Sequence, residues 1–245
     1  MGTGGWQPTH RLVRAVLRAF IRLAFAVLTR LRIEGEENLP EEGPLLVVAN
    51  HFHFVDPVAV IRAMPWPLEF IGGAQLPNAP TGVKWLTTLW GTTRVHRGGS
   101  SRDALRAAEA ALSAGGIFGI FPEGGSWAAV LRPARPGAAY LAARTGAPIL
   151  PVGLDGLTDL FSSLRRLRRA RVTIRIGRPF GPFEAVPRGR KGREAIDRIG
   201  ETVMRSIAEL IPPSRHGVFS DDAAVRAAAQ DAAAYPWSHE REGLE

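Results

Sequence analysis

The sequence predicts a single α/β domain in which a mostly parallel or mixed sheet is flanked by helices, preceded by an amphipathic N-terminal helix. Short apolar runs of strand length alternate with helical runs, which is the order expected of a sheet covered by helices. The 245 residues suit one such domain, and a hydrophobic content of 45% is enough to fill its core. The segment before Glu34 has a helical period and contains no acidic residue.

The segment from His10 to Ile33 is predicted to form one basic amphipathic helix. Its arginines recur at spacings of three, four and four residues and share one stripe: Arg11, Arg14, Arg18 and Arg22. Apolar residues fall on the other side: Val13, Val16, Leu17, Phe20, Leu23, Ala24, Val27, Leu28 and Leu31. This pattern favours a helix in the membrane interface, with its guanidinium groups on lipid phosphates. The alternative is a helix packed on the domain, although such helices usually mix acids with bases on their exposed face.

The early apolar run is interrupted by arginines, which is not typical of a secretory signal. No run reaches the roughly 18 uninterrupted apolar residues that a spanning helix needs. We therefore expect a peripheral or monotopic membrane protein on the cytoplasmic face. Residues 1–33 are its expected membrane-associating helix, 34–213 its α/β domain and 214–245 a peripheral tail.

After an acidic, turn-rich linker from Glu34 to Pro44, predicted strands and helices alternate. Apolar runs of strand length predict strands at 45–49, 69–71, 93–95, 117–121, 149–154 and 172–176. Helical runs predict helices at 57–63, 83–90, 101–114, 136–145 and 193–211. Asp56 is a candidate N-cap with Pro57 at the first helical position. Gly115 and Gly146 are placed to end the helices before them.

The chain has no cysteine, which excludes disulfides, thiolate metal sites and a cysteine nucleophile. Its net charge of +8 comes almost entirely from arginine, which suits nucleic acid, anionic membranes or phosphorylated substrates. A cluster from Arg165 to Arg171 is predicted to be a solvated loop or helix face, with contact to a phosphate surface as the alternative. We expect no nucleic-acid partner, because helix-turn-helix, zinc-finger and RNA-binding signals are missing.

His51 and Asp56 follow the first predicted strand of the domain and are five residues apart across a turn. The carboxylate is then able to hold the proton of one ring nitrogen and leave the other as a general base. This is the base-and-orienter pair of serine hydrolases without the serine, so the nucleophile would be a hydroxyl of the substrate. The alternative is a histidine at a strand end beside a helix-capping aspartate.

Three further blocks follow other predicted strands. Glu123 lies in a Phe-Pro-Glu-Gly sequence, beside glycines that let a substrate approach the backbone. Arginines end the strand at 93–95, and prolines border the strand at 149–154. With Asn50-His51-x4-Asp56, the order and spacing of these blocks resemble the glycerolipid acyltransferase family, which includes the lysophosphatidic acid acyltransferases. The resemblance extends from about Leu45 to Leu154.

The resemblance implies a role for each matching residue. His51 takes the place of the general base and Asp56 that of its orienting partner. The implied substrate-binding residues are Asn50, Arg97, Glu123, Gly124, Gly125 and Pro151, with Arg97 on the acceptor phosphate. One departure is clear: the family block continues with an arginine after Phe-Pro-Glu-Gly, whereas this chain reads Gly-Ser-Trp. Arg132 or Arg135 would then supply the charge, or the acceptor has another head group.

The resemblance also implies the reaction, which is transfer of a fatty acyl group from a thioester to a glycerolipid hydroxyl in phospholipid biosynthesis. The partners are membrane lipids and an acyl donor, acyl-CoA or acyl carrier protein, with no resident cofactor and no metal. Backbone N–H groups near Gly124 are candidates for binding the developing oxyanion. The alternatives are an acyltransferase for a non-phosphate lysolipid and a non-catalytic lipid- or nucleic-acid-binding protein.

Overall fold

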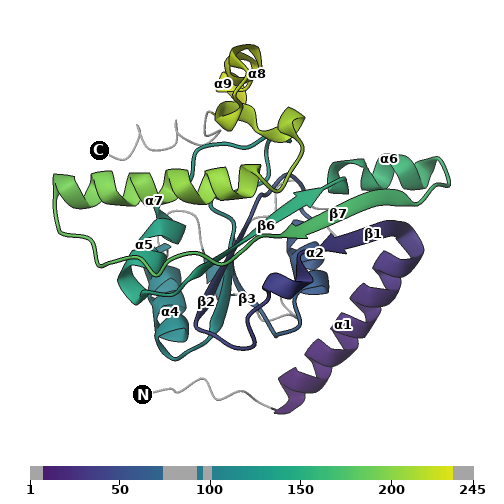
Figure 1. Ribbon diagram of the computed structural model, residues 1–245. Helices are drawn as coiled ribbons and strands as arrows, with labels where there is room; N and C mark the ends of the chain where they lie inside the picture. The colour runs from purple at the N-terminus through teal and green to yellow at the C-terminus, as the bar shows by residue number, and fades with distance from the viewer. Residues whose placement is uncertain (1–7, 74–92, 96–100, 234–245) are drawn as a thin grey trace, which may run out of the picture.

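The computed structural model describes residues 8–73, 93–95 and 101–233 (Figure 1). Within these ranges one sheet has the strand order β1-β7-β6-β2-β5-β3-β4. The strands are β1 (Thr29–Glu34), β2 (Leu45–Ala49), β3 (Glu69–Gly73), β4 (Thr93–Val95), β5 (Ile117–Ile120), β6 (Ile149–Asp155) and β7 (Ala170–Ile176). All the pairings are parallel except β6 with β7, so the sheet is mixed and the predicted fold class is confirmed.

Helices cover both faces of the sheet (Figure 1). They are α1 (Pro8–Leu28), α2 (Asp56–Ala63), α4 (Ser101–Ser113), α5 (Pro136–Thr145), α6 (Leu160–Arg165), α7 (Arg190–Ala208), α8 (Ala223–Ala228) and α9 (Gln230–Ala233). Short 3-10 turns at Glu36–Asn38, Leu157–Asp159, Pro213–Arg215 and Gly217–Phe219 join some of these elements. The helix expected at 83–90 lies outside the described residues.

Strand β2 lies at the centre of the sheet, between β6 and β5. Its side chains alternate between two apolar clusters: Leu45, Val47 and Ala49 join one, and Leu46 and Val48 join the other. Helices α1, α2 and α6 contribute to the first cluster, and α4, α5 and α7 to the second. Because β2 is buried on both faces, its sequence is an unbroken apolar run. The residues that follow its carboxyl end therefore lie at the edge of the sheet, between the helices of its two faces.

The N-terminal helix is shorter than predicted, because residues 29–33 belong to strand β1 and not to the helix. Arg30 and Arg32 are exposed, whereas Leu31 and Ile33 pack on the apolar cluster of that face. This alternation has the period of a strand. Parallel pairing of β1 with β7, about 140 residues along the chain, satisfies its backbone. Strand β1 is therefore part of the sheet, although the prediction assigned its residues 29–33 to the N-terminal helix.

Two arginines of the predicted stripe, Arg14 and Arg18, face the domain and not outward as predicted, whereas Arg22 is exposed. Arg14 lies 3.8 Å from Glu69 of β3, and Arg18 donates to the Met64 carbonyl at the end of α2. The Arg18 guanidinium supplies a hydrogen-bond donor to a carbonyl at the end of α2, and its positive charge interacts favourably with the negative end of the α2 dipole. The outward face is apolar instead, with side chains 38–62% exposed: Val13, Val16, Phe20, Leu23, Val27 and Leu28. We call these six residues the apolar stripe.

The segment after Ser214 is not a peripheral tail over its described part. Phe219 is 9% exposed and belongs to the cluster formed with α5 and α7. The Leu131 N–H donates to the Arg215 carbonyl at 2.9 Å, which joins this segment to the connection between β5 and α5. The segment therefore contributes to the core, and the domain extends past the boundary predicted at residue 213.

Candidate active site

The loop between β2 and α2 carries His51 and is organised by Asp56. Asp56 is 1% exposed, and its Oδ2 accepts the backbone N–H groups of Phe52 and His53, both at 2.7 Å. The same oxygen lies 3.0 Å from His51 Nδ1. The carboxylate is therefore turned back toward the loop and makes no N-cap hydrogen bond to α2, contrary to the capping prediction.

The predicted histidine–aspartate pair is thus brought together. Because a carboxylate only accepts hydrogen bonds, Nδ1 is the donor in this contact, and in the neutral ring Nε2 is then the nitrogen with the free lone pair. The His51 ring stacks on Phe121 at a centroid distance of 4.3 Å. Its side chain remains 14% exposed. The ring is held on one face and one edge, which is the arrangement that a general base requires.

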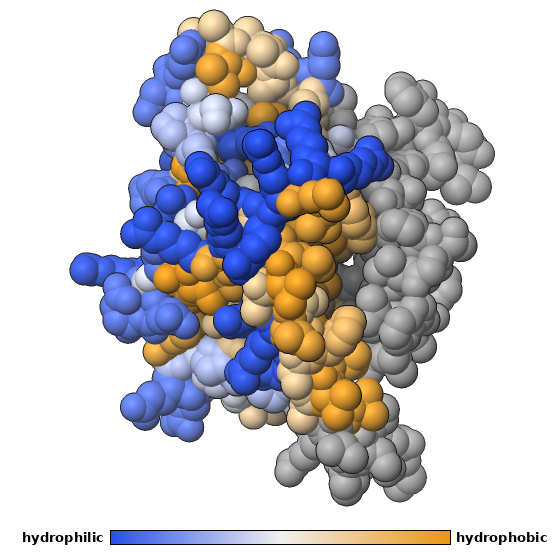
Figure 2. Space-filling model, turned by 90° about the vertical axis from the view of Figure 1, so that its right-hand side faces the viewer, coloured by the Kyte–Doolittle hydropathy of each residue, from blue (hydrophilic) through white to orange (hydrophobic). Residues whose placement is uncertain are grey.

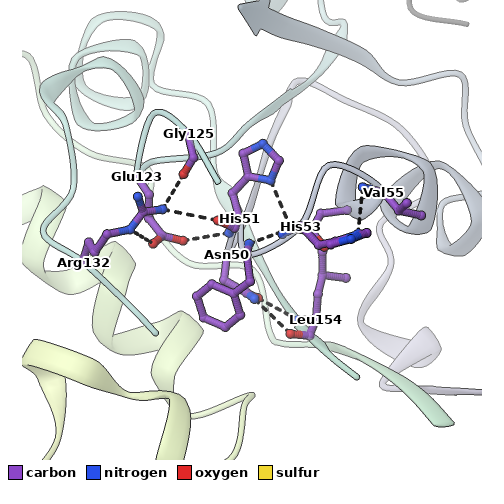
Figure 3. Close-up of polar contacts among 10 residues, drawn as sticks. Asn50, His51, His53, Val55, Glu123, Gly125, Arg132 and Leu154 are labelled. Atoms are coloured by element: carbon purple, nitrogen blue, oxygen red, sulfur yellow. Dashed lines mark hydrogen bonds and ion pairs between the residues drawn. The ribbon is translucent and has the colours of Figure 1, made fainter. Parts of the chain in front are cut away.

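Glu123 and Arg132 form a buried ion pair beneath the backbone of His51 (Figure 3). Glu123 Oε1 accepts the His51 N–H at 2.7 Å, and Glu123 Oε2 accepts from Arg132 Nε at 2.8 Å. Arg132 Nη2 donates to the His51 carbonyl at 3.3 Å and also to the Gly125 carbonyl. The pair therefore holds both backbone polar groups of His51.

The ion pair is fully enclosed, since both side chains are about 1% exposed. Burial raises the pKa of Glu123, and the Arg132 guanidinium counteracts this rise. Burial also lowers the pKa of Arg132, against the opposing effect of Glu123. The Trp127 ring covers the guanidinium at 3.6 Å, so that the cation faces an aromatic surface as well as the carboxylate. Each side chain is thus kept charged in the protein interior by the opposite charge of its partner.

This arrangement gives two residues contacts that the sequence did not indicate. Glu123 is enclosed and bonded to protein groups, and its contacts position the loop. Arg132 is equally enclosed and pairs with Glu123. The sequence analysis did not predict that Arg132 contacts the backbone of His51. The signal that could have indicated it is that Arg132 lies in the same loop as Phe-Pro-Glu-Gly, where the family's usual arginine is missing.

The remaining predicted binding residues also have other contacts. Asn50 is fully buried, and its amide exchanges two hydrogen bonds with the Leu154 backbone, at 2.9 and 2.7 Å. This joins the end of β2 to β6 and leaves Asn50 a structural role. Pro151 lies within β6 opposite Val48, and its carbonyl accepts the Gly177 N–H. Arg97 lies outside the described residues.

The two glycines shape the loop after β5. Gly124 has a φ of 77°, a left-handed conformation that strains any residue with a side chain, and a Cβ there would also require Arg135 to move. Its N–H donates to the Phe121 carbonyl at 3.1 Å and is already used, which argues against Gly124 itself as an oxyanion donor. Gly125 contributes its carbonyl to Arg132. Among the described residues no group of three or more His, Asp or Glu side chains is arranged to hold a metal ion.

His53, two residues after His51, has different surroundings. Its ring lies 4.5 Å from Phe54 and 5.6 Å from Phe161 of α6, both between centroids. Burial lowers its pKa, while Asp56 raises it by a smaller amount. Its ring has no carboxylate hydrogen bond comparable to that of His51; its Nδ1 lies 3.4 Å from the Val55 N–H. His53 is therefore a suitable control for His51.

Known proteins resemble this chain across the same region. A solved structure, the 1-acyl-sn-glycerophosphate acyltransferase PlsC from Thermotoga maritima, has 27% sequence identity and a TM-score of 0.56, and the match covers 82% of this chain and 81% of that one. The 1-acyl-sn-glycerol-3-phosphate acyltransferase of Borreliella burgdorferi is 28% identical over 62% of each chain. The chloroplastic BAT2 enzyme of the same name from Brassica napus is 30% identical, over 51% of this chain and 37% of its own. The chain thus spans less than two thirds of the length of these two sequence relatives.

The family comparison covers the part of the chain that builds the site. Residues 30–155 match the Acyltransferase family, a range that begins in β1 and ends with β6. It includes the His51–Asp56 pair and the Glu123–Arg132 pair described above. By this match the chain belongs to the Acyltransferase family.

Proposed function

We propose that this protein is an O-acyltransferase that moves a fatty acyl group from an acyl thioester to a hydroxyl of a lysophospholipid or glycerol-3-phosphate-type acceptor. The observation that carries the proposal is the 3.0 Å contact of His51 Nδ1 with Asp56, on a ring that remains partly exposed. Membership of the Acyltransferase family supports it. The acyl donor is acyl-CoA or acylated acyl carrier protein, since both carry the acyl group as a thioester.

In the proposed reaction, His51 Nε2 removes the proton of the acceptor hydroxyl as its oxygen attacks the thioester carbon. Asp56 stabilises the imidazolium that forms. The tetrahedral intermediate then collapses, the carbon–sulfur bond breaks, and the imidazolium returns the proton to the departing thiolate. The products are an ester and a free thiol, and the histidine regains its initial state.

The acceptor depends on which residues bind its head group. The arginine that follows Phe-Pro-Glu-Gly in the family is missing here, and Arg132 is enclosed. Arg97 keeps its proposed role on an acceptor phosphate. The second candidate is an acyltransferase for a lysolipid without a phosphate, for which Arg97 has no such role.

A thiol-release assay with acyl-CoA tests the activity directly. Lysophosphatidate, glycerol 3-phosphate, lysophosphatidylcholine and monoacylglycerol are compared as acceptors in detergent micelles. We expect acceptor-dependent thiol release with one of the phosphate-bearing compounds, and Arg97→Gln should raise KM for that compound. Release with monoacylglycerol alone favours the second candidate. If lysolipid binds but neither acyl-CoA nor acylated acyl carrier protein releases thiol, the proposal that the protein is an acyltransferase is contradicted.

We further propose that α1 attaches the protein to the membrane surface through its apolar stripe. No helix in the described part of the chain is both long and apolar enough to span a bilayer. The stripe runs along the outside of α1, and Figure 2 shows an apolar band on the side of the molecule that carries this helix. Burial of such side chains below the headgroups supplies the binding free energy.

Replacement of Phe20 and Leu23 by serine should weaken binding to phospholipid vesicles at least tenfold. These side chains are 61% and 62% exposed, so the domain loses little packing while the membrane loses two large apolar groups. Vesicle sedimentation measures the change. Tyr140→Ser on α5 is the matched control, since Tyr140 is 39% exposed on another helix. Equal sedimentation of the double variant and the wild type would refute this attachment. Deletion of residues 1–33 is a poorer test, because it also removes most of β1.

A further inference from the structure

We propose that the turn between α6 and β7 is a second membrane contact, in which Leu167 enters the bilayer and the arginines around it bind the phosphate groups of anionic lipids. The turn comprises Arg165, Arg166, Leu167 and Arg168. This inference rests on the proposed attachment of α1 and adds a separate site, far along the sequence, with its own chemistry.

The first observation is the exposure of Leu167. Its side chain is 96% exposed, more than any other large apolar side chain in the described part of the chain. A single exposed leucine is ordinary on a protein surface. Here, however, the leucine lies at the tip of a turn with arginines on both sides, so that it projects from a cationic surface.

The second observation is the backbone conformation of Leu167. Its φ is 53°, in the left-handed region. The Leu167 N–H donates to the Leu164 carbonyl and the Arg168 N–H to the Ser163 carbonyl, which is the hydrogen-bond pattern that ends a helix in a Schellman motif. Glycine is usual at this position, and a leucine costs about 1–2 kcal/mol there. A residue that is both strained and exposed gains nothing for folding, which points to a use for its side chain.

The third observation is the charge of the turn. Arg165, Arg166 and Arg168 are exposed, and the sequence from 160 to 183 contains no acidic residue to neutralise them. Guanidinium groups bind phosphate through a planar pair of donors, and basic residues near an anionic bilayer add binding energy. An apolar tip within a basic ring matches the depth profile of a bilayer, with phosphates outside and acyl chains beneath. Nucleic acid also offers phosphates but has no apolar layer beneath them, so the fully exposed leucine favours the bilayer.

The fourth observation is the position of the turn relative to α1. Arg169, directly after the turn, donates to the Thr29 carbonyl at 2.9 Å and to the Ala26 carbonyl in the last turn of α1. The start of β7 is therefore joined to the end of the apolar stripe. In Figure 2 the apolar band has strongly hydrophilic side chains gathered at one end, on the side that carries α1 and the α6–β7 turn in Figure 1.

Two arginines of α1, Arg14 and Arg18, face the domain and are not offered to lipid phosphates beside the apolar stripe. The turn adds three exposed arginines near the end of that stripe. Two contacts also fix the orientation of the domain, which one helix alone leaves free to rotate about its axis. Helix α6 reaches the active-site loop as well, because Phe161 stacks on Phe54 at 5.7 Å.

Two variants test the proposal in the full-length chain, by sedimentation with vesicles of phosphatidylcholine containing phosphatidylglycerol. Arg165→Gln/Arg166→Gln/Arg168→Gln should weaken binding about 100-fold at low salt, and on pure phosphatidylcholine it should match the wild type. Leu167→Gly should weaken binding about tenfold, and unchanged binding of this variant would show that Leu167 does not enter the bilayer. Because glycine suits the left-handed conformation, this variant should be at least as stable to thermal unfolding as the wild type, which excludes misfolding as the cause.

The control is Arg188→Gln/Arg193→Gln/Arg198→Gln, which removes three exposed arginines, one just before α7 and two within it, and makes the same change in net charge. It should bind vesicles nearly as the wild type does. Equal losses in the two triple variants would overturn the proposal, since net charge alone would explain them. Unchanged vesicle binding with reduced binding to duplex DNA in the turn variant would also overturn it. Thiol release in detergent micelles should be the same in all variants, so failure of the second contact is distinguishable from failure of the acyltransferase assignment.

Discussion

Replacement of His51 by alanine is expected to lower kcat for acyl transfer by about 10²- to 10⁴-fold, the usual contribution of a general base. The reason is that Nε2 of this ring is the proposed proton acceptor for the substrate hydroxyl. The protein should remain folded, because Asp56 keeps the Phe52 and His53 N–H groups at 2.7 Å and the backbone of residue 51 keeps its contacts with Glu123 and Arg132. Thiol release and thermal unfolding, measured on the same preparation, separate the two effects.

The matched control is His53→Ala. His53 lies in the same loop and its ring contacts Phe54 and Phe161, but Asp56 accepts only its backbone N–H. We expect a change in kcat of only a few-fold. Acyl transfer near the wild-type rate in His51→Ala would refute the general-base role. A larger loss in His53→Ala than in His51→Ala would transfer that role to His53.

Replacement of Arg132 by methionine should have the largest effect on stability, with a loss of about 3–5 kcal/mol in the free energy of unfolding. The substitution leaves the Glu123 carboxylate enclosed without its cation, and the His51 and Gly125 carbonyls lose a donor. Urea unfolding measures this change. Arg144→Met is the control, because Arg144 also meets a carboxylate at 2.8 Å, but on the surface, where such pairs contribute about 0–1 kcal/mol.

The double variant Glu123→Leu/Arg132→Met separates stability from positioning. Removal of both charges avoids an unpaired buried ion, so most of the lost stability should return. The backbone of His51 still lacks its carboxylate acceptor and its guanidinium donor, so kcat should remain well below that of the wild type. Recovery of stability together with full kcat would mean that the ion pair only stabilises the fold. A stability loss from Arg132→Met no larger than that from Arg144→Met would contradict the enclosed ion pair.

The His51–Asp56 pair could be predicted because both residues lie in one short loop, where five residues of separation and a turn allow few arrangements. The direction of the Asp56 carboxylate could not be predicted in the same way. A helix N-cap and a loop acceptor use the same residue type at the same place, and the backbone N–H groups of residues 52 and 53 decide between them. The contact of Glu123 with His51 spans 72 positions and exists only because β2 and β5 are neighbours in the sheet.

Local patterns were enough to predict the α/β class, strand β2, helix α5 with its terminal Gly146, and the histidine–aspartate pair, because these depend on periodicity and residue type over a few positions. Where α1 ends, which of its side chains point outward and what Arg132 binds could be learned only from the folded chain. Each of these depends on segments distant in the chain. Residues 29–34 pair with β7, Arg14 and Arg18 of α1 contact β3 and the end of α2, and Glu123 reaches the His51 backbone from the loop after β5. Local patterns do not contain such pairings, since the same amphipathic helix fits a membrane on one side and a protein core on the other.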